Sequence, residues 1–296
     1  MTNKAIMKLE ELNLLDRFLF DETMENREAY QAAVSILLED EIELLEKPET
    51  EKELRVSSKL RQVRLDVVSM DKDSRIYYTE MQQRDTGNLR KRSRYYQAQM
   101  DVSLLEPGSK DFNLLNDTCF ILIAPFDLFG RDLYRYTFEG ICRECPDLKI
   151  EDGAIRIFIN TKGTNRQEFS QEFLDFMEYI NATTDAVAEK TDSSRIKLIH
   201  ENVRKIRTSE KMGVKYMQLW EEKAYIREDA RAKGLAEGLA EGRTKGLAEG
   251  CAKGIEALIL DNLEEGKNRE TIIKKLVRHF SLTDEEAGSY FEKYKK

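Results

Sequence analysis

Two carboxylates and an amide stand at regular spacing in residues 63–82, VRLDVVSMDKDSRIYYTEMQ. Both halves of this segment alternate with the period of two that a β-strand requires, and the polar link at 71–74 favours a turn. A hairpin therefore places Glu80 and Gln82 on one face and brings Asp66 opposite them. We expect the two carboxylates to converge on a cleft that solvent reaches.

Acidic side chains held this close repel each other unless a cation neutralises them. Carboxylate oxygens are hard ligands that suit Mg²⁺ or Mn²⁺. The spacing of Asp66 and Glu80 therefore favours a metal site. The alternative is a solvated strand face, because Asp and Glu are usually exposed.

Basic side chains follow the acidic pair directly. Although the whole chain carries a net charge of −8, residues 84–96 contain five basic residues and one acidic residue. Contacts to phosphate depend on such local clusters and not on the average charge of the chain. The cluster predicts contacts to the phosphates of a nucleic acid through Arg84, Arg90, Lys91 and Arg94, and the sequence alone does not distinguish DNA from RNA.

The pattern of Asp66 followed by Glu80-Met81-Gln82 resembles the active-site signature of the PD-(D/E)XK nuclease superfamily, in its branch of recombination-promoting nucleases and transposases. The resemblance covers most of the chain. It extends through RSRYYQAQMD, CFILIAPFDLFG, RIFINTKG and EFLDFMEYI to a glycine-repeat tail. The final Lys of the superfamily signature is replaced by Gln82.

This resemblance implies a fold, an activity and a cofactor. The fold would be α/β, with a restriction-endonuclease-like αβββαβ core and helical additions. The activity would be that of a Mg-dependent endodeoxyribonuclease, which hydrolyses phosphodiester bonds of DNA during recombination or transposition. Asp66, Glu80 and the backbone carbonyl of Met81 would bind Mg²⁺ or Mn²⁺, and Gln82 would orient the attacking water.

The first helix of many relatives adds another acid to the metal site. Asp16, Asp21 and Asp40 are candidates here, and the sequence does not choose among them. Gln82 carries no charge with which to stabilise a developing negative charge. The alternative function is therefore a catalytically weak or inactive nuclease-fold scaffold that binds DNA or protein.

Hydrophobic periodicity predicts the elements that must position these residues. Helices are expected over 27–40, with a shorter one before it, and over 89–105, 170–180, 193–206 and 213–231; strands are expected at 118–125, 133–138 and 155–160 as well as in the hairpin. The helix over 89–105 is expected to bury Tyr95, Ala98 and Val102. An αβββαβ core also requires one more strand before Val63.

Residues 47–61 are polar and predict a surface connection into the hairpin. Its basic residues, together with one that follows, would be near enough to touch DNA: Arg55, Lys59, Arg61 and Arg64. Ordinary surface charge is the alternative for all four.

The chain is expected to comprise a nuclease-like domain (1–215), a helical glycine-repeat segment (216–257) and a small helical module (258–296). Six glycines recur at every fourth position from Gly234 to Gly254. In a helix this stripe winds by roughly 40° per repeat, and the glycines cost on the order of 6 kcal/mol relative to alanine. We expect a marginal helical linker, with a homo-oligomer formed through the repeat as the alternative.

The four cysteines suggest neither a disulfide framework nor zinc. Cys142 and Cys145 form one CxxC with no second pair, and His200 and His279 lie far away in sequence. The apolar runs are too short to span a bilayer and the N-terminus lacks a signal-peptide core. We therefore expect a cytoplasmic protein without a membrane partner.

Overall fold

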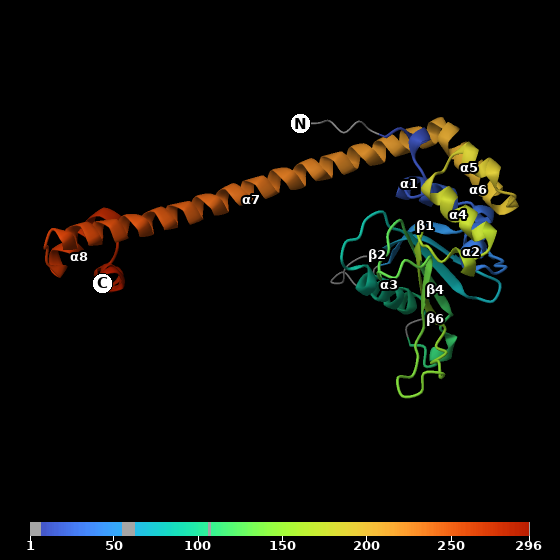
Figure 1. Ribbon diagram of the computed structural model, residues 1–296, viewed down its shortest axis with the longest axis horizontal. Coiled ribbons are helices and arrows are strands. Elements are labelled where there is room, and N and C mark those ends of the chain that lie inside the picture. The colour runs from blue at the N-terminus through green and yellow to red at the C-terminus, as the bar shows by residue number, and fades with distance from the viewer. Residues whose placement is uncertain (1–6, 55–62, 106–107, 296) are drawn as a thin grey trace. The chain divides into compact units, whose positions relative to one another are not determined.

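The computed structural model describes residues 7–54, 63–105 and 108–295 of the chain. The chain divides into two compact units, Met1–Met217 and Gln218–Lys296. The first unit contains a six-stranded mixed sheet with helices around it (Figure 1). The α/β class predicted from the sequence is therefore confirmed.

The strands of the sheet lie in the order β1-β2-β3-β4-β6-β5. Their bounds are β1 Glu49–Leu54, β2 Val63–Met70, β3 Ile76–Met81, β4 Thr118–Ala124, β5 Arg135–Phe138 and β6 Ala154–Asn160. The first three strands are antiparallel, β4 joins β3 in parallel, β6 joins β4 in parallel, and β5 pairs antiparallel with β6. The parallel β3–β4 pair needs a crossover connection, which a helix supplies.

Side chains cap the start of each helix of the sheet-bearing part of the first unit except α3. Their bounds are α1 Arg17–Met24, α2 Arg27–Leu38, α3 Leu89–Leu104, α4 Gln171–Asn181, α5 Asp185–Lys190 and α6 Ser194–Thr208, with short 3₁₀ turns at Leu9–Glu11, Phe112–Leu114 and Arg166–Glu168. Asp16 and Asn26 accept hydrogen bonds from the first turns of α1 and α2, and Ser170 and Ser193 do the same for α4 and α6. Such caps satisfy amides that have no partner within the helix.

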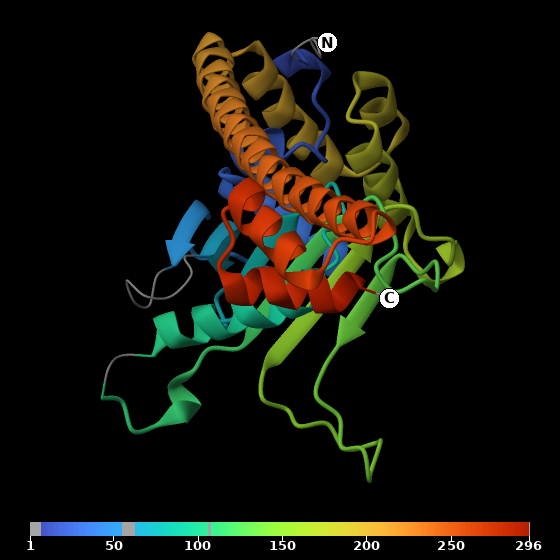
Figure 2. The ribbon, with the colours of Figure 1, turned by 90° about the vertical axis from the view of Figure 1, so that its left-hand side faces the viewer.

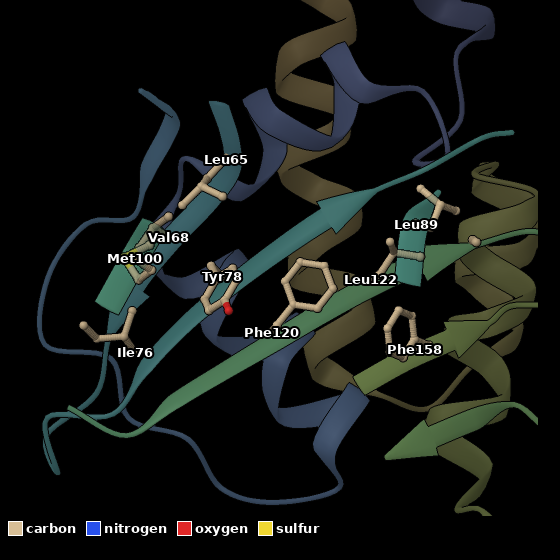
Figure 3. Close-up of a cluster of buried hydrophobic side chains, with 10 residues drawn as sticks. Leu65, Val68, Ile76, Tyr78, Leu89, Met100, Phe120, Leu122 and Phe158 are labelled. Atoms are coloured by element: carbon tan, nitrogen blue, oxygen red, sulfur yellow. The ribbon is translucent and has the colours of Figure 1, made fainter. Parts of the chain in front are cut away.

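Apolar side chains join α3, the crossover helix, to one face of the sheet. The ring centroids of Tyr78 and Phe120 are 5.1 Å apart, and Phe158 of β6 follows at 6.0 Å from Phe120. Figure 3 shows these three rings side by side, in a cluster to which α3 contributes Leu89 and Met100. This packing fixes α3 against the strands that carry the acidic pair.

Helices α1, α2, α4 and α6 cover the opposite face (Figures 1 and 2). The hydroxyl of Tyr30, which is fully buried in α2, lies 2.8 Å from the Thr79 hydroxyl of β3. Successive residues of a strand point to opposite faces. Glu80 therefore lies on the same face as Tyr78, toward α3.

Two sequence predictions about these elements are wrong. The supposed connection at 47–61 contains an edge strand, β1, which also supplies the strand required before Val63. In α3, Ala98 and Val102 are exposed. The residues that α3 buries are Leu89, Ser93, Gln97, Gln99 and Met100. The Gln97 amide donates a 3.1 Å hydrogen bond to the Thr118 hydroxyl, so that polar residues enter the interface.

The second unit continues α7, Glu210–Glu264, and adds α8, Arg269–Phe280, and α9, Asp284–Tyr294. Ile255, Ile259, Ile272 and Leu276 pack with Phe291 in a small core. The capping signal predicted before the last helix is confirmed, because Thr283 and Glu286 form a capping box.

The glycine repeat lies within α7, and its side chains are exposed. Leu235, Leu239 and Leu247 are each exposed by 64–66%. A Cβ added at Gly238 or Gly242 would meet nothing within 4 Å. No helix in the described part of the chain combines the length and apolar character that a membrane crossing requires.

Candidate functional site

Asp66 and Glu80 meet where the backbone pairing of β2 and β3 ends. The pairing runs from Met70 opposite Ile76 to Val67 opposite Thr79. Next to it, the Asp66 amide donates a 3.3 Å hydrogen bond to Glu80 Oε1, and the Met81 amide donates a 3.0 Å hydrogen bond to Asp66 Oδ2. Each acid thus holds the backbone of the opposite strand, and the hairpin brings the two side chains together.

The expectation that this pair faces a solvent-reachable cleft is wrong. Asp66 is 1% exposed and Glu80 is 4% exposed. Buried carboxylates are costly unless cations or hydrogen-bond donors stabilise them. The neighbouring helices supply those cations.

Arg17, the first residue of α1, bridges two acids. Its Nη2 forms an ion pair with Asp66 Oδ1, and its Nε donates a 3.4 Å hydrogen bond to Asp21 Oδ2. Asp21 is 4% exposed and lies one helical turn after Arg17. Of the three acids proposed for the first helix, the structure places Asp21 beside the pair.

Arg92 of α3 neutralises Glu80 from another direction. Its Nη2 lies 3.7 Å from Glu80 Oε2 and donates a 2.6 Å hydrogen bond to Gln82 Oε1. The Gln82 amide nitrogen donates in turn to the Arg84 carbonyl at 2.6 Å. Gln82 is therefore held in one orientation beside the pair, and a positive charge lies next to it.

The three carboxyl groups hold their protons more strongly than ordinary acids. Burial, reinforced by the Asp66 carboxylate, raises the pKa of Glu80 to about 8. The same two causes raise the pKa of Asp21 to about 8, against the attraction of Arg17. Burial also raises the pKa of Asp66, although Arg17 opposes this shift. In all three acids the effect of burial on the pKa outweighs the attraction of the neighbouring guanidinium groups.

The donor chemistry of the cluster fits a hard divalent cation. Asp21 Oδ1 and Asp66 Oδ1 are buried without a hydrogen bond, and carboxylate oxygens are the ligands that Mg²⁺ prefers. No three His, Cys, Asp or Glu side chains are gathered as a ready-made metal site within residues 7–54, 63–105 and 108–295. Arg17 lies between two of the acids instead. The carboxylate oxygens of Asp21 and Asp66 suit a metal ion, but in this structure they contact Arg17.

The predicted DNA-binding residues lie on the surface near this site. Arg84, Arg90, Lys91 and Arg94 are all exposed. Arg90 donates a 2.5 Å hydrogen bond to the Leu128 carbonyl, and its guanidinium lies 4.9 Å from the centre of the Phe129 ring. Arg90 is thus anchored, and the cluster presents positive charge to solvent.

Several other candidates lie elsewhere. Asp16 caps α1, and Asp40 follows α2 on the surface. Arg64 pairs with Glu51 on the edge strand. Arg55, Lys59 and Arg61 lie outside the described residues. The thiols of the CxxC, Cys142 and Cys145, are free.

Sequence reasoning did not single out Arg17 and Arg92 as members of the site. The i, i+4 spacing of Arg17 and Asp21 is a detectable signal for a helical ion pair. Arg92 was visible only as one of several basic residues in its segment. Its role depends on which face of α3 meets the sheet.

Comparisons of the chain with models of protein families, with curated proteins and with solved structures found no match. The geometry of the chain therefore carries the functional argument.

Proposed function

We propose that this chain is a metal-dependent DNA endonuclease that hydrolyses phosphodiester bonds. The observation that carries the proposal is the meeting of Asp66 and Glu80 at the end of the β2–β3 ladder, beside Asp21. Buried acids concentrated at one point are typical of catalytic sites and serve no evident packing need.

The order of elements supports the same proposal. A first helical layer, three antiparallel strands, a crossover helix and a parallel strand follow one another along the chain. This order agrees with a restriction-endonuclease-like αβββαβ core, in which the acids lie on the second and third strands. A role in recombination or transposition belongs to the proposal through the resemblance of the sequence.

Asp66, Glu80 and the Met81 carbonyl would hold Mg²⁺ or Mn²⁺, with Asp21 as the acid from the first helix. When bound, the ion would polarise the phosphate and lower the pKa of a bound water. The remaining hydrogen of the Gln82 amide would orient that water. Although Gln82 is neutral, Arg92 places a cation 2.6 Å from its amide oxygen, where it would stabilise developing negative charge.

The basic cluster would hold the DNA backbone. Arg84, Lys91 and Arg94 have exposed side chains and lie on the loop and helix that follow Gln82. Phosphate contacts are independent of base sequence and weaken steeply with salt. The proposal therefore includes salt-sensitive binding with little base preference.

Nicking of supercoiled plasmid in Mg²⁺ or Mn²⁺ at low salt tests the activity. We expect the native chain to nick the plasmid and Asp66→Ala and Glu80→Ala to be inactive. Glu53→Gln, a change at an exposed acid of the neighbouring strand β1, should retain activity. Loss of activity in the Glu53→Gln control, or nicking by both alanine variants, would contradict the assignment of the site.

The burial of the acids favours one second candidate, a nuclease-fold scaffold that binds DNA without cutting it. Asp66 and Glu80 are almost inaccessible and are paired with arginines in the present arrangement. A scaffold would bind DNA through the exposed basic cluster, remain intact in the presence of Mg²⁺, and never nick the plasmid. The nicking assay therefore separates the two functions.

A further inference from the structure

Arg17 occupies the position between Asp21 and Asp66 that a cation would take. Its contact with Asp66 is an ion pair that lacks hydrogen-bond geometry, because Arg17 Nη2 and Asp66 Oδ1 are both buried without a hydrogen bond. Asp21 Oδ1 also has no hydrogen-bond partner. The arginine therefore lies beside both aspartates but leaves one oxygen of each, Oδ1, without a hydrogen bond.

We infer that Arg17 is an internal counterion that competes with the divalent cation and must leave the two aspartates before the cation binds. The inference rests on the proposed metal site and adds a regulatory step to it. It assigns to Arg17 the control of metal affinity, and it assigns no catalytic contact to this residue.

The charges of the cluster make the two occupants mutually exclusive. A metal ion binds carboxyl groups in their deprotonated form, so three carboxylates would face the two guanidinium groups, Arg17 and Arg92, when the ion enters. An ion of charge two that replaced Arg17 would leave the cluster neutral, whereas an ion added beside Arg17 would place like charges together in a buried site. Like charges at short distance in a low-dielectric interior repel strongly.

Arg17 is also the arginine that is free to move away. Its side chain is 41% exposed, and its long flexible stem would carry the guanidinium into solvent. Arg92 is only 24% exposed and holds Gln82 with a 2.6 Å hydrogen bond. The aspartates are buried and fixed, so exchange of Arg17 for a cation requires little rearrangement of the backbone.

Binding of Mn²⁺ to the full chain, measured from the loss of the electron paramagnetic resonance signal of the free ion, tests this inference. Arg17→Met removes the charge and keeps an apolar stem, and we expect it to bind Mn²⁺ about tenfold more tightly than the native chain. Arg17→Lys should bind as the native chain does. Arg27→Met is the matched control, because Arg27 is the exposed first residue of α2, and it should leave the affinity unchanged.

A thermal-shift measurement supplies a second readout. Arg17→Met should unfold at a lower temperature than the native chain in a chelator, and Mn²⁺ should raise its unfolding temperature more than that of the native chain. If Arg17→Met does not fold, Arg17→Gln provides the neutral variant for both measurements.

The outcomes separate this inference from the proposed function. Equal or weaker Mn²⁺ affinity in the neutral variant, with binding still abolished by Asp66→Asn, would overturn the role of Arg17 and leave the metal site standing. No Mn²⁺ binding by either the native chain or the neutral variant would overturn the metal site and this inference together.

Discussion

Arg92 should stabilise the fold mainly through the charge of Glu80. The Glu80 side chain is 5% exposed, and the Arg92 side chain, 3.7 Å away, is 24% exposed. Removal of one partner of a buried ion pair costs about 3–5 kcal/mol. Because Arg92 is partly solvated, the loss for Arg92→Met should lie at the lower end, about 3 kcal/mol, including its hydrogen bond to Gln82.

A double-mutant cycle isolates the electrostatic part of this value. In a Glu80→Gln background no buried charge is left unpaired, so Arg92→Met should cost only about 1 kcal/mol for the lost hydrogen bond and packing. The expected coupling is therefore about 2 kcal/mol. The packing of Arg92 on the Tyr96 ring is lost in both backgrounds and cancels.

Urea unfolding at pH 9 in a chelator, where Glu80 is ionised because the pH lies above its pKa of about 8, gives the required free energies when followed by near-ultraviolet circular dichroism of the buried tyrosines. These tyrosines report on the first unit, whereas the single tryptophan, Trp220, lies in the second. Arg94→Met, two residues along α3 at an exposed position, is the control for a change of helix composition. Additive effects of Arg92→Met and Glu80→Gln would refute the electrostatic reasoning.

Three further perturbations test other parts of the structure. Gly163→Ala should destabilise the first unit by more than about 2 kcal/mol, since its Cβ would lie 2.4 Å from the Tyr134 backbone nitrogen; an unchanged urea midpoint would contradict that close approach. Gly238→Ala combined with Gly242→Ala should stabilise α7 by about 1 kcal/mol per site, because a Cβ at either position meets no other atom. Thermal melting followed by far-ultraviolet circular dichroism should show this gain in stability. No gain would mean that the two glycines contact another surface in solution. At Asp127, burial acts to raise the pKa, but hydrogen bonds from loop amides outweigh it and lower the pKa to about 2. Its contribution to stability is therefore fully present above about pH 4 and is lost as the pH falls through about 2. Asp127→Asn should cost about 1 kcal/mol at pH 7, after allowance for solvent screening, and nothing well below pH 2 in acid titrations of stability.

The hairpin, the main helices and the central strands could be predicted because burial on one face leaves a periodic apolar pattern. Strand β1, ETEKEL, could not, because an edge strand with exposed side chains needs no apolar pattern. The buried face of α3 was misjudged for a related reason. Gln97 enters the interface through its hydrogen bond to Thr118, and hydrophobic periodicity does not detect a buried polar residue.

The candidate site was predictable in part. Alternation in two strands was enough to bring Asp66 and Glu80 together. Their burial was not predictable, because it depends on Arg17 and Arg92, which come from helices on either side of the hairpin in sequence. Side chains that neutralise a buried acid are chosen by tertiary packing, and local spacing identifies only the pair Arg17 and Asp21.

A magnesium titration of plasmid nicking by the native chain and Asp66→Asn tests the central claim most directly. The account predicts nicking that rises with Mg²⁺ in the native chain, disappears in a chelator, and is absent from a folded Asp66→Asn at every Mg²⁺ concentration. Nicking by Asp66→Asn at the native rate, or a native chain that binds DNA and never nicks it, would contradict the account.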